Sequence, residues 1–324
     1  MSSQKERIEA AFELPAELSE QRLDQAVATL MPEHSRSRLQ NWIRSGELTV
    51  NGRTRKPRDR VVVDDRIAIC ASVAAETSWD PEPIDLDILH EDDQILVINK
   101  PAGLVVHPGA GHDSGTLVNA LLNHAPELER VPRAGIVHRL DRDTTGIMVV
   151  ARSLEARASL VEQLQSRTMG RDYEAVCAGG LTGGGHVDAP IGRHPSQRKK
   201  MAVVENGKAA VTHYRLLERL SGFSCIRCRL ETGRTHQVRV HMAHIHHPLV
   251  GDATYGKRTR YPRGADATVK HALERFRRQA LHARSLELLH PATGDPCQWH
   301  APLPGDMEQL LEALREFTHK GKQT

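Results

Sequence analysis

The residues best suited to chemistry lie in a polar stretch near the middle of the chain. From Val137 to Gly146 it reads Val-His-Arg-Leu-Asp-Arg-Asp-Thr-Thr-Gly. Its Asp141 lies between Arg139 and Arg142, and cations within about 4–6 Å of an Asp lower its pKa by roughly 1–3 units. We therefore expect an ionised carboxylate, which suits a nucleophile or charge stabiliser better than a general base. A structural reading is equally open, because Asp and Thr side chains often accept backbone N–H groups at tight turns.

Apolar runs on both sides of this stretch indicate how it is positioned. Residues 134–137 lead in, and residues 147–151 have the β-branched, apolar character of a buried strand. Residues 95–98 predict another buried strand, which ends at Lys100-Pro101 because proline cannot donate to a ladder. Residues 116–122 and 154–165 have helical character, and residues 173–177 predict a strand. The polar stretch is thus expected to be a loop held at both ends.

The polar stretch also resembles a known motif. His138 to Gly146 is similar to the signature of the RluA family of RNA pseudouridine synthases. Other segments resemble further motifs of this family, and together they cover most of residues 85–305: Glu91 to Gly109, Arg171 to Ala175, Leu230 to His241, Pro248 to Asp252 and Leu281 to Ala283.

This resemblance implies an enzyme that isomerises uridine to pseudouridine in ribosomal RNA, in which a buried target base leaves its stack. It implies Asp141 as the catalytic carboxylate, Tyr173 against the uracil ring and Arg234 as the partner that fixes Asp141. It places Arg139 where a family arginine enters the space left by the flipped base. The residues leave open whether Asp141 attacks C1′ or assists loss of the 2′ proton. The isomerisation involves no net redox change or group transfer, so no cofactor is required.

The chain is long enough, at 324 residues, for more than one domain. We expect a flexible lead-in over residues 1–17, a small RNA-binding domain over 18–75, a linker over 76–87 and a catalytic domain over 88–324. Helical patterns at residues 22–31 and 35–43, followed by a strand into an Asn51-Gly52 turn, resemble an S4-type RNA-binding domain. Strands and helices mix irregularly, which favours an α+β class. The family resemblance implies a large, mixed, mostly antiparallel sheet with flanking helices.

Positive charge is concentrated locally, although the whole chain carries only +3. Between Arg36 and Arg60 there are eight Lys or Arg against Glu47 and Asp59, a local charge of +6. A basic face of this kind is typical of nucleic-acid binding, while a merely solvated charged face is the alternative. The residues expected to contact RNA are Arg36, Arg38, Arg53, Arg55 and Arg58, with Arg139 and Arg142 in the polar stretch and Arg198 and Lys199 in a second basic loop.

Metal and nucleotide sites are not expected. Cys225 and Cys228 form a C-x-x-C pattern, but the surrounding strand pattern places residues three apart on opposite faces. The histidines at 236, 241, 244, 246 and 247 lack an acidic or thiolate partner at a recognisable spacing, so we expect them to be solvated or to face RNA. The glycines of Gly109 to Gly115 do not follow the dinucleotide-binding spacing.

The remaining patterns bear on localisation and on other functions. The sequence contains no run of about 18 apolar residues to span a bilayer, and its first residues lack the apolar core of a signal peptide. We therefore expect a cytoplasmic protein. Two other classes stay open: a non-catalytic RNA-binding factor of ribosome assembly, and a glycoside hydrolase using Asp141 and Asp143 as its carboxylate pair.

Overall fold

The computed structural model describes residues 6–32, 34, 36–73, 79–109, 112–197, 200–256 and 261–320. Contacts divide the chain into two compact units, Met1–Ser78 and Trp79–Thr324. The division falls within the predicted linker of residues 76–87.

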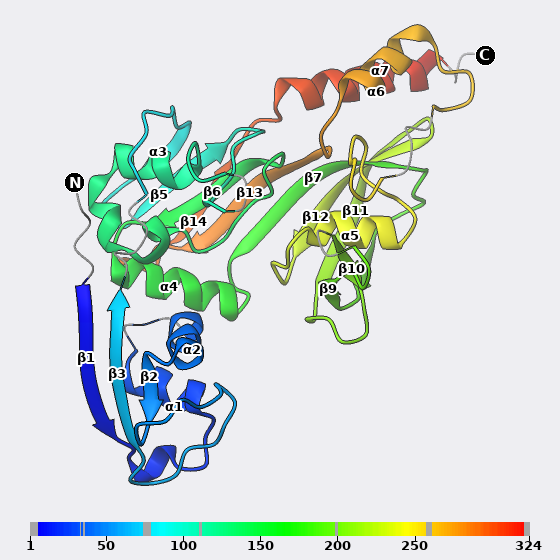
Figure 1. Cartoon of the computed structure of the whole chain (residues 1–324). Helices are drawn as coiled ribbons and strands as arrows, with labels where there is room; N and C mark the ends of the chain where they lie inside the picture. The colour runs from blue at the N-terminus through cyan, green and yellow to red at the C-terminus, as the bar shows by residue number, and fades with distance from the viewer. Residues whose placement is uncertain are drawn as a thin grey trace. The chain divides into compact units, whose positions relative to one another are not determined.

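The N-terminal unit is a three-stranded antiparallel sheet with two helices (Figure 1). Its core forms because Leu23 and Val27 of the first helix pack with Leu39 and Ile43 of the second, all with 0% exposure. Asn51 and Gly52 both have positive φ at the turn after β2. The two helices and the Asn-Gly turn predicted from the sequence are confirmed. The elements of this unit are β1 Glu6–Glu13, η1 Ala16–Leu18, α1 Leu23–Leu30, α2 Arg36–Ser45, β2 Leu48–Val50 and β3 Arg66–Val73.

The expected flexible lead-in is wrong for the residues that form β1. This strand pairs with β3 along its whole length, from Glu6 opposite Val73 to Glu13 opposite Arg66. Its partner lies more than fifty residues further along the chain, so no local pattern in residues 6–13 reveals the pairing.

The second unit is built on a large mixed sheet, which confirms the predicted α+β class. Within the described residues the sheet has nine strands, in the order β4-β5-β6-β13-β7-β12-β11-β8, with β14 paired to β13. The β6–β13 pair is parallel and the others are antiparallel. The strands are β4 Ile88–Glu91, β5 Ile95–Lys100, β6 Thr145–Ala151, β7 Gly170–Ala178, β8 Gly185–Asp188, β11 Val211–Leu220, β12 Phe223–Leu230, β13 Leu281–Leu289 and β14 Pro296–His300. A separate two-stranded sheet contains β9 Ile191–Arg193 and β10 Met201–Val203.

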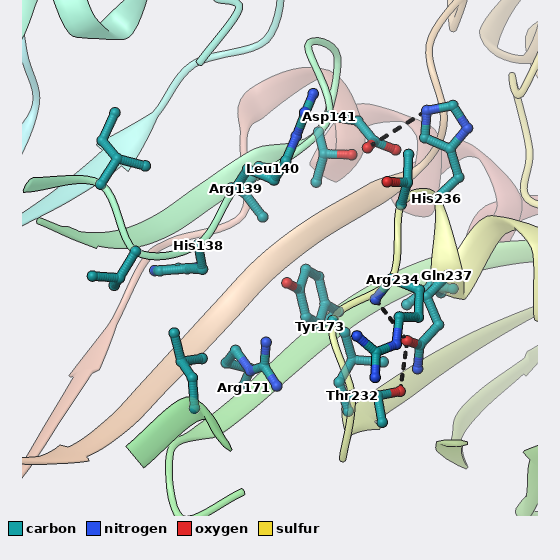
Figure 2. Close-up of a pocket in the computed structure, with 18 of the residues that line it drawn as sticks. His138, Arg139, Leu140, Asp141, Arg171, Tyr173, Thr232, Arg234, His236 and Gln237 are labelled. Carbon is teal, nitrogen blue, oxygen red and sulfur yellow. Dashed lines mark hydrogen bonds and ion pairs between the residues drawn. The ribbon is translucent and has the colours of Figure 1, made fainter. Parts of the chain in front are cut away.

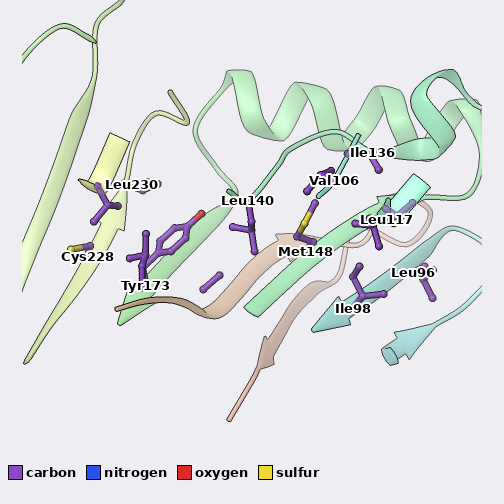
Figure 3. Close-up of a cluster of buried hydrophobic side chains, with 14 of the residues drawn as sticks. Leu96, Ile98, Val106, Leu117, Ile136, Leu140, Met148, Tyr173, Cys228 and Leu230 are labelled. Atoms are coloured by element: carbon purple, nitrogen blue, oxygen red, sulfur yellow. The ribbon is translucent and has the colours of Figure 1, made fainter. Parts of the chain in front are cut away.

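Helices cover both faces of this sheet because successive strand residues point to opposite sides. In β5, Leu96 and Ile98 belong to one buried cluster, shown in Figure 3, while Ile95 and Val97 belong to another. The first cluster includes residues of α3, and the second includes Leu160 of α4. The helices are α3 Leu117–His124, η2 Pro126–Arg130, η3 Pro132–Gly135, α4 Leu154–Gln165, α5 Gln237–His244, α6 Ala267–Arg275 and α7 Gly305–Lys320.

Most of the predicted linker belongs to the second unit. Asn119 of α3 donates its side-chain amide to the carbonyl of Asp80, and its own carbonyl accepts the N–H of Glu82. Trp79 and Leu86 pack against the cluster that contains α3. The expectation of a linker is therefore wrong for residues 79–87, which are fixed to the catalytic unit, while residues 76–78 lie outside the described residues.

Candidate active site

A cavity of about 850 Å³ lies in the second unit (Figure 2). The polar loop between η3 and β6, strand β7, helix α4 and the segment from Leu230 to Arg239 line it. Its volume is within the range of roughly 300–1,000 Å³ that is usual for ligand pockets. Four residues singled out in the sequence, Arg139, Asp141, Tyr173 and Arg234, line this one cavity.

The loop that carries Asp141 is fixed by neighbouring elements. The N–H of Thr144 donates to the carbonyl of Asp141 over 3.0 Å, which closes a tight turn. Lys100, at the end of β5, donates from Nζ to the carbonyl of Arg142 over 2.9 Å. Gly146 follows with a φ of +113°, and a Cβ there would collide with the backbone of Ala283 in β13. The loop is thus fixed by contacts with strands β5 and β13 of the sheet.

Asp141 pairs with Arg239, and not with the arginine expected from the sequence. Arg239 Nη1 donates to Asp141 Oδ2 over 2.8 Å. Arg234 lines the cavity, but its Nε donates to the carbonyl of Ala209. The prediction that Arg234 fixes Asp141 is therefore corrected to Arg239.

The neighbouring arginines of the loop are not ion partners of Asp141 either. Arg142 forms its ion pair with Asp143 at 3.0 Å, and Arg139 is exposed at the cavity. The sequence placed both cations beside Asp141, yet the turn directs their side chains elsewhere.

Arg239 is itself held by a second carboxylate. Its Nε and Nη2 donate to the two oxygens of Asp252 over 2.7 and 2.9 Å. Burial alone would raise the pKa of Asp252, but the hydrogen bonds from Arg239 keep it below its usual value. The exposed fractions of Arg239 and Asp252 are 6% and 4%, so a bidentate pair fixes the guanidinium. Asp141 therefore meets a cation whose position is set before any substrate arrives.

His236 is a site residue whose role the sequence did not reveal. It has a φ of +58° immediately before α5, and its Nε2 lies 3.7 Å from Asp141 Oδ1. The hydroxyl of Tyr255 lies 2.7 Å from its Nδ1. Burial lowers the pKa of His236, although Asp141 acts in the opposite direction. The only sequence signal is its place in the segment Gly233 to Arg239, which the family resemblance already covered.

The expectation of a solvated or RNA-facing histidine is wrong for His241. This residue has 0% exposure. Its ring nitrogens lie 2.9 Å from Thr212 Oγ1 and 2.9 Å from the carbonyl of Ala189. His241 therefore ties α5 to the sheet.

Tyr173 supplies an aromatic wall of the cavity. It is 7% exposed, and Figure 3 shows its ring in the same buried cluster as Leu140 and Leu230. Burial raises the pKa of Tyr173, so the side chain stays a neutral phenol at neutral pH. A neutral ring in this place can stack on a planar base.

The residues expected to contact RNA differ in their surroundings. Arg53, Arg55 and Arg58 are exposed in the turn region between β2 and β3. Arg36 is 46% exposed but pairs with the buried Asp24, Nη2 to Oδ2, at 2.8 Å. Arg38 is partly buried. Arg198 and Lys199, from the second basic loop, lie outside the described residues.

The described residues contain no group of three His, Cys, Asp or Glu side chains arranged to hold a metal ion. Cys225 and Cys228 are both buried, in different hydrophobic clusters, as expected for opposite faces of β12. Across the part of the chain that the structure describes, no helix is both long enough and apolar enough to cross a membrane.

Comparison with known proteins gives a family match in each of the two units. Residues 94–244 match the RNA pseudouridylate synthase family, and residues 21–67 match the S4 domain. The chain belongs to the RNA pseudouridine synthases, isomerases that convert uridine in RNA to pseudouridine.

Individual relatives are similar over nearly the whole chain. Ribosomal large subunit pseudouridine synthase D of Pseudomonas aeruginosa is 58% identical, over 95% of this chain and 97% of its own. The protein of the same name from Yersinia pestis is 54% identical, over 93% of each chain. Among solved structures, human RNA pseudouridylate synthase domain containing 4 is 29% identical with a TM-score of 0.56, covering 71% of this chain and 93% of its own.

Proposed function

We propose that this protein isomerises specific uridines to pseudouridine in large-subunit ribosomal RNA, and that its target is the stem-loop of helix 69 in 23S ribosomal RNA. The RNA is bound within a large-subunit precursor or the assembled subunit. The names of the two bacterial relatives support the choice of large-subunit RNA. One observation carries the chemistry: a carboxylate, Asp141, is oriented by the buried pair of Arg239 and Asp252 at a cavity with an aromatic wall.

The proposed reaction breaks the bond from C1′ to N1, turns the uracil and rejoins it to the ribose through C5. Asp141 serves as the catalytic carboxylate, and its ion pair with Arg239 fixes its orientation. The flipped uracil lies against Tyr173, and the exposed Arg139 enters the space that the base leaves in the RNA. Electrostatic groups that are fixed before the reaction need no reorganisation during it, which is an efficient form of catalysis.

We assign affinity and target choice to the N-terminal unit. Its exposed arginines Arg53, Arg55 and Arg58 follow one another along a turn region, where they can meet successive phosphates. Arg36 also has a structural role, because it forms an ion pair with Asp24, whose side chain is 0% exposed. This unit contains none of the residues assigned to the chemistry.

The target assignment is tested by mapping pseudouridines in ribosomal RNA from a strain that lacks this protein. We expect pseudouridine to disappear from helix 69 and to return when the gene is restored, but not when the Asp141→Asn variant is supplied. Loss at other positions of the large-subunit RNA, with helix 69 unchanged, would contradict the target. An unchanged pseudouridine map would favour a non-catalytic assembly factor.

A further inference from the structure

Arg171 is a buried cation without a partner among the described residues. It lies in β7 and is 7% exposed. Its Nε is buried with no hydrogen-bond partner, and its guanidinium makes no ion pair within the described part of the chain. An arginine keeps its charge at any physiological pH, and a buried charge is strongly unfavourable unless it is paired. Arg171 therefore has no protein partner for its charge among the described residues.

The surroundings show where that partner must come from. Arg171 lines the cavity, and it precedes Tyr173 by two residues, so both side chains leave the same face of β7. Figure 2 shows the guanidinium of Arg171 near the Tyr173 ring. Burial, and then the charge of Arg171, lower the pKa of His138 to about 3, so this neighbouring ring is neutral and does not balance the charge of Arg171.

Three other arginines of the cavity have partners within the protein. Arg239 has two carboxylates, Arg167 pairs with Glu231 at 2.9 Å, and Arg234 donates from Nε to a backbone carbonyl. Arg171 differs from all three, because it is as buried as Arg239 and yet has no acceptor.

Gly233 provides the space for this guanidinium. A Cβ at residue 233 would lie 2.8 Å from Arg171 Nη1. Gly233 does not have the positive φ that favours glycine elsewhere in the chain, and a side chain at residue 233 would require the guanidinium of Arg171 to shift. The segment above the cavity therefore accommodates Arg171 in this position.

We propose that Arg171 binds a carbonyl oxygen of the flipped uracil and stabilises the negative charge that the base carries when its bond to C1′ breaks. This inference rests on the proposed function. The electron pair of the C1′–N1 bond leaves with the uracil and spreads over N1, O2 and O4. The pair then forms the C5–C1′ bond, the C5 proton is released and N1 takes up a proton, so the product is a neutral isomer.

A uracil oxygen fits this position better than a phosphate. The neighbouring lining includes the Tyr173 ring and the apolar side chains of Leu164 and Leu230, which suit a planar base. RNA phosphates lie along a solvated backbone, where the exposed Arg139 and Arg234 can reach them. A donor placed where charge develops in the transition state is typically responsible for about 10²–10³-fold in rate.

The first test replaces Arg171 with methionine and measures the single-turnover rate at saturating RNA, separately from affinity. We expect the rate of Arg171→Met to fall by about 10²–10³-fold, with the dissociation constant and its salt dependence nearly unchanged. The matched control is Arg229→Met, because Arg229 lies outside the cavity and pairs with Glu287 at 3.2 Å; its rate should stay at that of the unmodified protein. Weaker binding with a flatter salt slope and an unchanged rate would show a phosphate contact and overturn the proposal.

A second measurement separates charge stabilisation from structural damage. RNA that carries 5-fluorouridine at the target releases a less basic base, so its C1′–N1 cleavage should depend less on Arg171. We expect the rate defect of Arg171→Met, followed as loss of the target nucleoside, to be at least tenfold smaller on this RNA than on uridine RNA. Equal defects on both substrates would mean that Arg171 only maintains the fold of the site. If uridine RNA is not converted by the unmodified protein, the proposed function itself fails.

Discussion

The ion-paired residues around Asp141 in the cavity are largely buried, whereas the arginines in the turn region between β2 and β3 are exposed. In the cavity, Asp141, Arg239 and Asp252 form a chain of ion pairs in which the last two members are nearly inaccessible to solvent. In the N-terminal unit, Arg53 and Arg55 are exposed to water. Buried pairs keep a fixed geometry and are little screened by salt, whereas exposed charges are mobile and strongly screened. The first arrangement suits chemistry, and the second suits salt-dependent affinity for a polyanion.

The largest effect is expected from Asp141→Asn. The amide keeps the shape of the side chain but loses its charge, so the single-turnover rate should fall by more than about 10³-fold, as is common when a central catalytic group is removed. RNA affinity should change less than twofold. Asp143→Asn is the matched control, since Asp143 pairs with Arg142 in the same loop. Parallel loss of binding would indicate a structural Asp141, and equal loss of rate in both variants would indicate a carboxylate pair.

Arg239→Lys should have the next largest effect. A lysine keeps the positive charge but cannot reach Asp141 and both oxygens of Asp252 with one fixed fork. We expect the rate at saturating RNA to fall by about 10²-fold, while affinity is retained. Arg315→Lys, at an exposed pair with Glu218, serves as the control for folding and rate. An Arg239→Lys variant with full activity would show that orientation of Asp141 is unimportant.

The buried Lys100 allows the effect of burying a charge to be tested through the pH dependence of stability. Burial lowers its pKa from 10.5 to about 8, despite the opposing charges of Asp143 and Asp141. Below pH 8 both the folded and the unfolded chain hold this proton, so the penalty for the buried cation is fully present. Between pH 8 and 10.5 the unfolded chain binds the proton more strongly, and the contribution of Lys100 to the free energy of unfolding should rise by up to about 1.4 kcal/mol per pH unit.

This contribution is measured as the difference between the unmodified protein and Lys100→Met in urea unfolding from pH 7 to pH 10. The difference should become more favourable to the unmodified protein as the pH rises through this window. A flat difference would mean that Lys100 keeps an ordinary pKa.

The smallest effect is expected from chelators. No group of metal-ligating side chains exists among the described residues. Neither the ion pairs of the cavity nor the exposed arginines of the N-terminal unit require a bound metal ion. Activity on uridine RNA should be the same before and after treatment with a chelator. Inhibition that zinc reverses would contradict this expectation.

The sequence predicted the elements whose signals are local. The helices at 22–31 and 35–43 and the strand that ends at Lys100 have regular apolar spacing and clear stop signals. Strand β1 was not predicted because the strand it pairs with, β3, is far away in the chain. Residues 79–87 look like a linker for a similar reason, because Asn119, which binds the carbonyl of Asp80, lies far away in the chain.

The sequence predicted the active site only in part, because the contacts between distant segments are not visible in it. The motif that contains Arg234 and Arg239 was recognised, but which arginine meets Asp141 depends on where α5 begins. Because α5 starts at Gln237, Arg234 lies in the preceding turn and Arg239 on the buried face of the helix. Arg239 lies between Val238 and Val240, and this apolar setting is the sequence signal that could have identified it as the buried cation.

The division of labour between the two units is tested most directly by deleting residues 1–78 and measuring salt dependence and maximal rate together. Residues 79–324 form a compact unit of their own. If about four basic side chains of the deleted unit meet phosphates, the slope of log affinity against log salt should flatten by roughly 3. The rate at saturating RNA should fall much less than the affinity. A folded truncated protein with an unchanged slope, or one that is saturable and inactive, would contradict this account.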